Sequence, residues 1–218
     1  AEPTPDESID DTTAADTTTA ADAAPGGADT ADDETTSPKT ERPDGPYDLD
    51  EVDADAIEKT HLDFGGLRIR GTQGMKLQFQ VDQRTGNATS VLIGEGEAAV
   101  QLVAVAAPRS SGMWERTRLE IAADARRRGG SADEAKGPFG TELRLVVPVT
   151  RPDGAKAVQP SRVSGIDGPR WMLRATFLGK AITDASAFAR LVDVVRGAGV
   201  VRGSSPMAPG DGIVSPTL

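Results

Sequence analysis

The sequence contains no cysteine and only one histidine among its 218 residues. Without cysteine there can be no disulfide, no thiolate metal site and no cysteine nucleophile. A single histidine, His61, excludes metal centres built from several imidazoles, and it precedes the first expected strand of the main sheet. We expect His61 to be a partly exposed side chain at a strand entry and not a catalytic base.

A hydrophobic run long enough to cross a bilayer is also missing. The longest apolar stretch, Val100–Ala107, is interrupted by Gln101 and falls well short of the roughly 20 residues that a membrane helix needs. The first residues show neither the basic nor the apolar region that is typical of a signal peptide. We therefore expect a cytoplasmic protein that does not associate with membranes.

Recognised catalytic and phosphate-binding motifs are absent from the sequence. Gly94 and Gly96 lack a third glycine at the dinucleotide-binding spacing, because Ala99 stands there, and no P-loop, nucleophile elbow or metal-binding loop occurs. Glu95 and Glu97 flank an expected turn, where neither carboxyl would be buried as acid–base catalysis requires. The sequence thus predicts no catalytic residue, no cofactor and no metal, and we expect a protein that is not an enzyme.

Charge is unevenly distributed along the chain. Residues 1–45 carry 13 acidic and two basic side chains, a net charge of −11, whereas the remaining 173 residues carry 21 acidic and 22 basic ones. Ile9 is the only large aliphatic residue of this segment. Such a composition cannot bury enough apolar surface to offset the entropy of ordering the backbone. We expect residues 1–45 to form a disordered acidic tail rich in Ala, Thr and Asp.

Three interpretations of the tail remain open. It can serve simply as a solubilising segment without a specific partner. Its threonines can also be phosphorylated, and Thr35 and Thr36 are the candidate sites because they follow the acidic run 32–34. Finally, its charge can mimic nucleic acid and cover a basic surface.

Residues 46–203 show the pattern of a single domain, followed by a Pro/Gly-rich segment, 204–218, that we expect to be loosely ordered. Alternating apolar and polar side chains predict strands, with turn residues between them. Asp133 and Glu134 fall in an expected loop. The expected strands cover residues 75–81, 89–93, 98–107, 141–149, 171–178 and 200–201.

Two helices are predicted by apolar side chains at helical spacing. The first runs from Met113 to Arg128 and the second begins after a cap at Thr183 or Asp184 and ends at Gly197. Strands without regular strand–helix alternation favour an α+β fold. We expect an antiparallel sheet of about six to seven strands with both helices packed on one of its faces.

Tryptophan and arginine provide the remaining candidate features. Trp114 and Trp171 align with apolar stripes, which favours core packing. The arginines at 126–128 occupy the last helical turn, where cations complement the helix dipole, and Asp124 is placed to pair with Arg128. Contacts to phosphate are the alternative role for this cluster.

Six short sequence blocks follow one another in a distinctive order. They are Gly45–Tyr47, Ala106–Arg109, Gly137–Leu143, Val158–Pro160, Asp167–Arg174 and Val200–Gly203. In this order the blocks resemble an uncharacterised actinobacterial family, domain of unknown function 3710, over about residues 45–213. The resemblance implies a bacterial cytoplasmic protein, and it brings no established activity, cofactor or catalytic residue.

The leading hypothesis is a non-enzymatic protein-binding or adaptor domain that recognises an unknown protein partner. It would use the polar face of the sheet and nearby loops, and the candidate partner-binding residues are Arg109, Arg144, Arg170 and Arg174. The alternative is a nucleic-acid-associated module in which the acidic tail masks a basic surface. A small-molecule enzyme, with a pocket assembled from distant carboxylates, is a third hypothesis.

Overall fold

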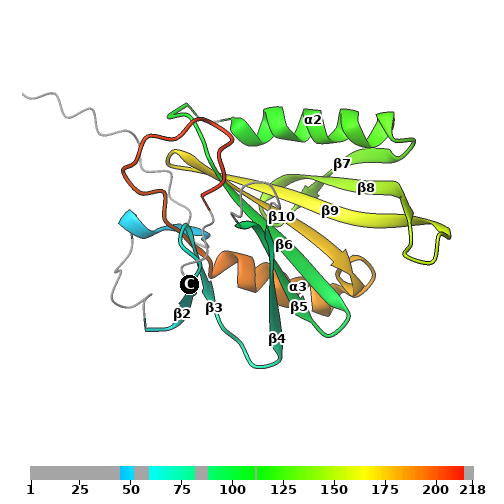
Figure 1. Ribbon diagram of the computed structural model, residues 1–218, viewed down its shortest axis with the longest axis horizontal. Helices are drawn as coiled ribbons and strands as arrows, with labels where there is room; N and C mark the ends of the chain where they lie inside the picture. The colour runs from blue at the N-terminus through cyan, green and yellow to red at the C-terminus, as the bar shows by residue number, and fades with distance from the viewer. Residues whose placement is uncertain (1–44, 52–58, 82–87, 111, 214–218) are drawn as a thin grey trace, which may run out of the picture. The chain divides into compact units, whose positions relative to one another are not determined.

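The protein is described by a computed structural model over residues 45–51, 59–81, 88–110 and 112–213. Within these ranges the strands form two sheets (Figure 1). Seven strands form the main sheet in the order β4-β5-β6-β10-β9-β8-β7, and four short strands form a smaller sheet in the order β1-β11-β3-β2.

The main sheet joins two antiparallel meanders. The chain forms β4, β5 and β6 in succession, crosses over through helix α2, and then forms β7 to β10, so that β10 returns to pair with β6. Every pair of neighbours in this sheet is antiparallel. Its strands are β4 (Met75–Val81), β5 (Ala88–Glu95), β6 (Ala98–Ala106), β7 (Ser131–Gly137), β8 (Gly140–Thr150), β9 (Lys156–Gly168) and β10 (Trp171–Gly179).

The smaller sheet brings the start and the end of the domain together. In it β1 pairs in parallel with β11, and β3 pairs antiparallel with both β11 and β2. Its strands are β1 (Tyr47–Asp48), β2 (His61–Asp63), β3 (Leu67–Arg70) and β11 (Gly199–Val200). The helices of the described chain are α2 (Met113–Arg127), α3 (Ala185–Arg196) and the short 3-10 helices η1 (Leu49–Glu51) and η2 (Lys180–Ile182).

The antiparallel sheet, its seven strands and the two α-helices confirm the predicted α+β class, but several elements differ. The expected loop at Asp133 and Glu134 is wrong, because both residues lie in β7. Strand β9 was not predicted. His61 is a half-buried side chain at the start of β2, which confirms its expected place at a strand entry. Asp184, one of the two expected caps, caps α3 by accepting hydrogen bonds from the backbone N–H groups of Ser186 and Ala187.

The helices lie over opposite faces of the main sheet, so the predicted packing on one face is not confirmed (Figure 1). Successive side chains of a strand point to opposite faces. On β10, Leu173 packs in one core with Leu191 of α3, whereas its neighbour Met172 packs in the other core with Trp114 of α2. Helix α2 contacts β7, β8 and β9, and α3 contacts β6 and β10.

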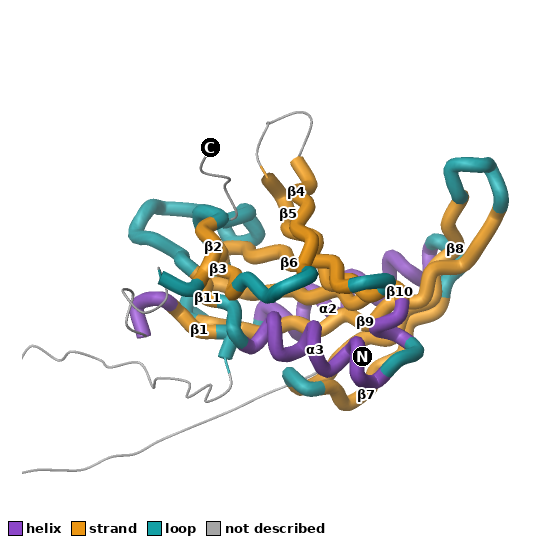
Figure 2. Tube along the Cα trace, turned by 90° about the horizontal axis from the view of Figure 1, so that it is seen from below, coloured by secondary structure: helices purple, strands orange, loops and turns teal. Residues whose placement is uncertain are grey.

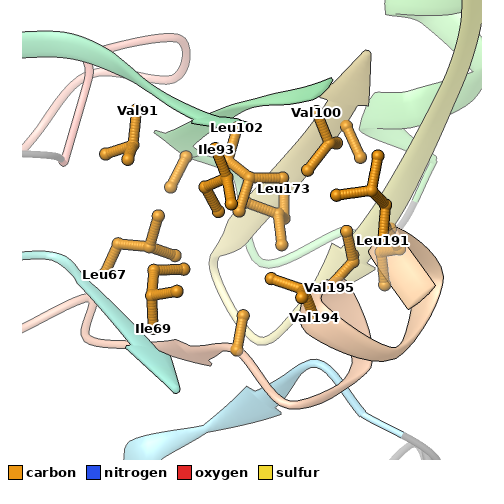
Figure 3. Packing of buried hydrophobic residues seen from close by; sticks show 14 of the residues in the cluster. Leu67, Ile69, Val91, Ile93, Val100, Leu102, Leu173, Leu191, Val194 and Val195 are labelled. Carbon is orange, nitrogen blue, oxygen red and sulfur yellow. The ribbon is translucent and has the colours of Figure 1, made fainter. Parts of the chain in front are cut away.

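The larger core lies between the main sheet, α3 and the smaller sheet (Figure 3). Leu67 and Ile69 of β3 face the apolar side chains of β5 and β6, and Val195 of α3 closes the core from the side. These three side chains are fully buried. Each contributes about 1.5–3 kcal/mol relative to remaining in water. The larger core therefore ties β1–β3 and β11 to the main sheet.

Strands β8 and β9 extend past both of their neighbours. Strand β7 pairs with β8 only as far as Val146, and β10 pairs with β9 only from Arg162 onward. Residues 147–150 and 156–159 therefore pair only with each other, and we call residues 146–160 the ribbon. Figure 2 shows the ribbon projecting from the rest of the sheet.

Candidate functional site

One half of the main sheet has a face that neither α-helix covers. Helix α2 lies over β7, β8 and β9 and leaves the same side of β4, β5 and β6 uncovered, with β10 at the border. We call this half the open face. Cross-strand pairing places its side chains in rows, since directly paired residues share a face. One row holds Gln78, Leu92, Gln101 and Thr176.

Arg174 lies at the border of the open face without a counterion. It pairs across the strands with Val103 on one side and Gly165 on the other, and the Trp114 ring lies against Gly165. Its Nε atom is buried and has no hydrogen-bond partner in the described chain. This burial lowers the pKa of Arg174 from its ordinary value, because desolvation disfavours the charged guanidinium. Among the described residues a half-buried cation is thus left without a partner, beside a surface that neither α-helix covers.

Polar side chains on β4, β5 and β6 form a hydrogen-bonded group on the open face. Ser90 donates from Oγ to Oε1 of Gln80 at 2.8 Å, and Gln101 donates from Nε2 to Oγ of Ser90 at 3.0 Å. Ser90 is 2% exposed, and these two hydrogen bonds satisfy its buried hydroxyl group. The predicted polar sheet face therefore exists, and these amides position one another on it.

Two of the predicted arginines, Arg109 and Arg170, meet at one end of the domain with a third, Arg202. The Arg170 carbonyl accepts a hydrogen bond from Ala107 N at 2.8 Å, which fixes the Arg109 loop against the β9–β10 turn. Nη2 of Arg170 donates to Gly203 O at 3.0 Å, which brings the Arg202 segment to the same place. We call Arg109, Arg170 and Arg202 the arginine end.

The backbone of Arg170 adopts a conformation that is unusual for a residue other than glycine. Its φ angle is 59°, and it is the only non-glycine residue with positive φ in the described chain. Left-handed backbone costs an L-residue roughly 1–2 kcal/mol. The hydrogen bonds made by the Arg170 carbonyl and guanidinium hold this conformation in place.

Carboxylates near the arginine end are engaged with N–H groups. Asp48 accepts from Trp171 Nε1 at 2.7 Å, Asp167 accepts from Trp114 N at 3.0 Å, and Asp211 accepts from Ala208 N at 2.8 Å. Within the described residues, none of the three arginines of this end forms an ion pair. Arg170 and Arg202 donate instead to the backbone carbonyls of Gly203 and Ser205, at 3.0 Å each.

Arg144 belongs neither to the open face nor to the arginine end, because it lies on the side of the sheet that α3 covers. Its Nε is 3.4 Å from Oε1 of Glu142, and the guanidinium of Arg162 binds the same carboxylate through two nitrogens at 2.8–3.1 Å. Glu142 is completely buried, and the Arg162 guanidinium stacks 3.6 Å above the Phe188 ring of α3. Arg144 and Arg162 thus serve to neutralise a buried carboxylate.

The arginines at 126–128 are engaged in contacts within their own segment. Asp124 pairs with Arg127 at 3.1 Å and with Arg128 at 3.8 Å, the second being the predicted pair. Arg126 donates to Ala132 O at 2.8 Å. These contacts stabilise the C-terminal end of α2 and its turn into β7.

The other predicted candidates contribute no assembled site. Thr35 and Thr36 lie outside the described residues. His61 is held by Thr60 and by the carbonyl of Gly197, at 2.8 Å each. Glu97 pairs with Lys180, whose ammonium lowers the pKa of that carboxyl. In the ranges given above, no three His, Cys, Asp or Glu side chains gather as metal ligands.

Two functional or structural side chains escaped the sequence reading. Arg202 follows a very short strand, and only its place in the block Val200–Gly203 singles it out. Glu142 precedes an apolar strand position and was not distinguished from surface charges. The signal present in both cases was the sequence block, since Glu142 lies in Gly137–Leu143 and Arg202 in Val200–Gly203.

A comparison with protein families supplies the identity that the geometry alone does not. Residues 45–215 match the family described as "Protein of unknown function (DUF3710)". This chain belongs to that family. The match confirms the resemblance seen in the sequence blocks, and four of those six blocks meet around the arginine end of this DUF3710 domain: 45–47, 106–109, 167–174 and 200–203.

Solved structures offer only distant likenesses to the DUF3710 domain. The solution structure of cyanobacterial PsbP (CyanoP) from Synechocystis sp. PCC 6803 is 8% identical, covers 62% of this chain and 87% of its own, and has a TM-score of 0.37. The crystal structure of LpqN, involved in cell envelope biogenesis of Mycobacterium tuberculosis, is 13% identical. Its match covers 72% of this chain and 99% of the LpqN chain, with a TM-score of 0.29. A comparison with curated proteins finds no match.

No helix in the described ranges combines the length and the apolar character that crossing a bilayer requires.

Proposed function

We propose that this DUF3710 domain is a non-enzymatic protein-binding or adaptor module that receives a protein partner on its open face. The observation that carries the proposal is Arg174, a half-buried guanidinium with no partner among the described residues, at the edge of the sheet half that neither α-helix covers. A charge withdrawn from water without a counterion costs several kcal/mol. A carboxylate of a docked partner would remove that cost, and arginine is among the residues that most often dominate binding energy.

The surroundings of Arg174 suit a protein surface. Gln78 is exposed, and Leu92 and Gln101 are partly exposed in the adjacent row, so the open face combines amide donors with apolar area. Mixed surfaces of this kind are typical of protein–protein interfaces. Arg109 at the arginine end is exposed as well and can extend the contact to further acidic groups of the partner.

The test compares the full-length protein with its Arg174→Met variant as baits for proteins of its natural host. We expect the variant to lose specific partners that the wild-type protein retains, because the methylene stem is preserved while the charge is removed. Arg116→Met, a charge change at an exposed position of α2, is the matched control and should retain them. If both variants captured the same proteins as the wild type, the open face would not be the binding surface.

Stability separates binding from a structural role of Arg174. Because the guanidinium is desolvated and unpaired, we expect Arg174→Met to unfold at a urea concentration equal to or higher than the wild type. A large loss of stability would show that Arg174 serves the fold.

Nucleic acid is the competing source of anions and is an outcome of the same experiment. The 173 residues after the tail have a net charge of only +1, and the arginines at 126–128 are engaged within α2 and its turn. Capture that disappears steeply with added salt would favour a nucleic acid over a protein partner. We keep the cytoplasmic location expected from the sequence as part of this proposal, and cell fractionation tests it.

A further inference from the structure

The ribbon carries an apolar surface that is separate from the open face. Across its strands Val146 pairs with Pro160, and Pro148 pairs with Val158. Since directly paired residues share a face, all four side chains point to the same side, which is the side of Arg144 and Arg162. Val146 is 38% exposed, Val158 is 65% exposed, and both prolines are exposed. Four apolar side chains therefore stand together in water.

Positive charge lies beyond one end of this apolar surface, at the tip of the ribbon. The row before the surface is balanced, because Arg144 and Arg162 bind the Glu142 carboxylate and Asp133 of β7 pairs across from Arg144. The row after it holds Thr150 opposite the exposed Lys156. Arg151 follows in the turn, and the only acidic side chain between residues 147 and 160 is Asp153, which accepts a hydrogen bond from Ala155 N.

The edges of the ribbon are less suited to binding than its face. Each ribbon strand has one free edge, and each carries a proline, Pro148 or Pro160, that has no N–H to offer an incoming strand. Prolines on exposed strands oppose pairing between edges. What the ribbon offers is therefore the side-chain surface of its valines and prolines.

We propose that this face of the ribbon binds a short segment of a protein partner in which apolar side chains are followed at one end by Asp or Glu. The apolar side chains would cover Val146, Val158 and the two prolines, and burial of such area is the main source of affinity. The carboxylates would pair with the exposed Lys156 and Arg151 at the tip of the ribbon. This charge match fixes the position of the segment along the ribbon.

The experiment uses the full-length protein to select from a displayed library of random short peptides. We expect the enriched peptides to share apolar positions with acidic residues on one side of them. Affinity of a selected peptide should fall about tenfold or more in Val146→Thr/Val158→Thr, which keeps β-branched side chains but adds polar groups to the surface. Lys156→Glu should weaken the same peptide by repulsion.

Two controls make the result specific. Leu119→Gln removes a comparably exposed apolar side chain, 59% exposed on α2, and should leave peptide affinity unchanged. Arg174→Met should also leave it unchanged, because the open face is a different surface. Loss of binding in Arg174→Met would instead assign the peptides to the open face and overturn the ribbon proposal without affecting the proposed function.

Two further outcomes would overturn the ribbon proposal. Selected peptides without acidic residues, or with affinities that the ribbon variants do not change, would show that this face does not select the proposed chemistry. A concentration-dependent dimer in sedimentation equilibrium, abolished by Val146→Thr/Val158→Thr, would show that a second copy of the chain occupies the face. Circular dichroism of each variant confirms that the fold is kept.

Discussion

At the scale of single residues, Glu142 and Arg174 differ in how their charges are compensated. Glu142 is completely buried, but two arginines donate to its carboxylate, and Gly137 leaves the room that the carboxyl group fills. Arg174 is partly buried with no anion among the described residues. We infer that the Glu142 cluster is a structural contact between β7, β8, β9 and α3, and that Arg174 is a binding contact.

The Glu142 cluster gives the first prediction. Glu142→Gln removes the negative charge while the Arg162 guanidinium, 19% exposed, stays in place without compensation. We expect the free energy of unfolding to fall by about 3 kcal/mol, as when one partner of a buried pair is removed. Urea denaturation measures the change. Arg144→Gln is the control, and at a side chain 58% exposed it should cost less than about 1 kcal/mol.

Close packing of Trp114 on β9 gives the second prediction. A Cβ on Gly165 would lie 2.1 Å from Cδ2 of Trp114, so Gly165→Ala must displace the indole and with it the hydrogen bond from Trp114 Nε1 to Thr141 O. We expect a loss of about 1–3 kcal/mol in the free energy of unfolding.

Gly94 provides the matched control for Gly165, because it also lies inside a strand of the main sheet. A Cβ there would meet nothing closer than 3.9 Å, from Lys76. Gly94→Ala should therefore change stability by no more than about 0.5 kcal/mol. Equal midpoints of urea unfolding for Gly165→Ala and Gly94→Ala would refute the close packing of Trp114.

At the scale of elements, the sequence predicted those strands and helices whose apolar side chains recur regularly. Strand β10 alternates Trp171, Leu173, Ala175 and Phe177 on one face, and α3 shows helical spacing with an Asp cap. Strand β7 escaped prediction because Ala132 is its only buried side chain. Its pairing with β8 places it in the sheet, and this pairing is a tertiary contact that no local pattern contains.

The side on which each helix packs could not be predicted, for a related reason. Each helix shows which of its own faces is buried, but the face of the sheet that it covers depends on strand register. Leu143 of β8 pairs with Val163 of β9, and Val163 pairs with Thr176 of β10, so Leu143 points away from Leu173. Because β9 was not predicted, the sequence could not show that these side chains of β8 and β10 point to opposite faces.

The N-terminal cap of α3 gives the third prediction. The backbone N–H groups of Ala187 and Ser186 hold the pKa of the Asp184 carboxyl below its ordinary value of 3.8. A carboxyl with a depressed pKa in the folded protein stabilises it above the unfolded pKa, and this contribution disappears as the pH falls through the folded pKa. Asp184→Ala should therefore be less stable than the wild type at neutral pH, and the difference should begin to shrink near pH 3.8 and reach its minimum below the lowered pKa of the folded protein.

Asp184→Asn separates the hydrogen bonds of this cap from its charge. Asparagine is also a good N-cap but does not titrate in this range. Its stability relative to Asp184→Ala should stay constant with pH. Urea midpoints measured from neutral to acidic pH test both variants, and a pH-independent difference between the wild type and Asp184→Ala would contradict the account.

At the scale of the whole domain, the candidate surfaces are assembled from segments that are far apart in the sequence. Arg109 and Arg170 were predicted as separate loop residues, and only the hydrogen bond from Ala107 N to Arg170 O places them together with Arg202. Arg144 shares their residue type and exposed pattern but points to the α3 side and pairs with Glu142. The sequence therefore identified arginines as candidate binding residues. Which of them lie together depends on strand register and on turn contacts.

The two cores on opposite faces of one sheet give the last prediction. The chain has two tryptophans, and each lies in one core: Trp171 in the larger core with α3, and Trp114 in the smaller core with α2. Strand β10 supplies Leu173 to the first core and Met172 to the second, so neither core can lose its packing without disturbing this strand. We expect the domain to unfold in a single cooperative transition.

Single-tryptophan variants test this coupling directly. In Trp171→Phe the fluorescence reports the α2 core, and in Trp114→Phe it reports the α3 core. Both variants lose a hydrogen bond from an indole N–H and will differ in stability from the wild type. Within each variant, however, urea curves from fluorescence and from far-UV circular dichroism should coincide. If the Trp114 signal of Trp171→Phe changed well before its circular dichroism, the α2 core would be an independent unit, and shared strand β10 would not couple the two faces.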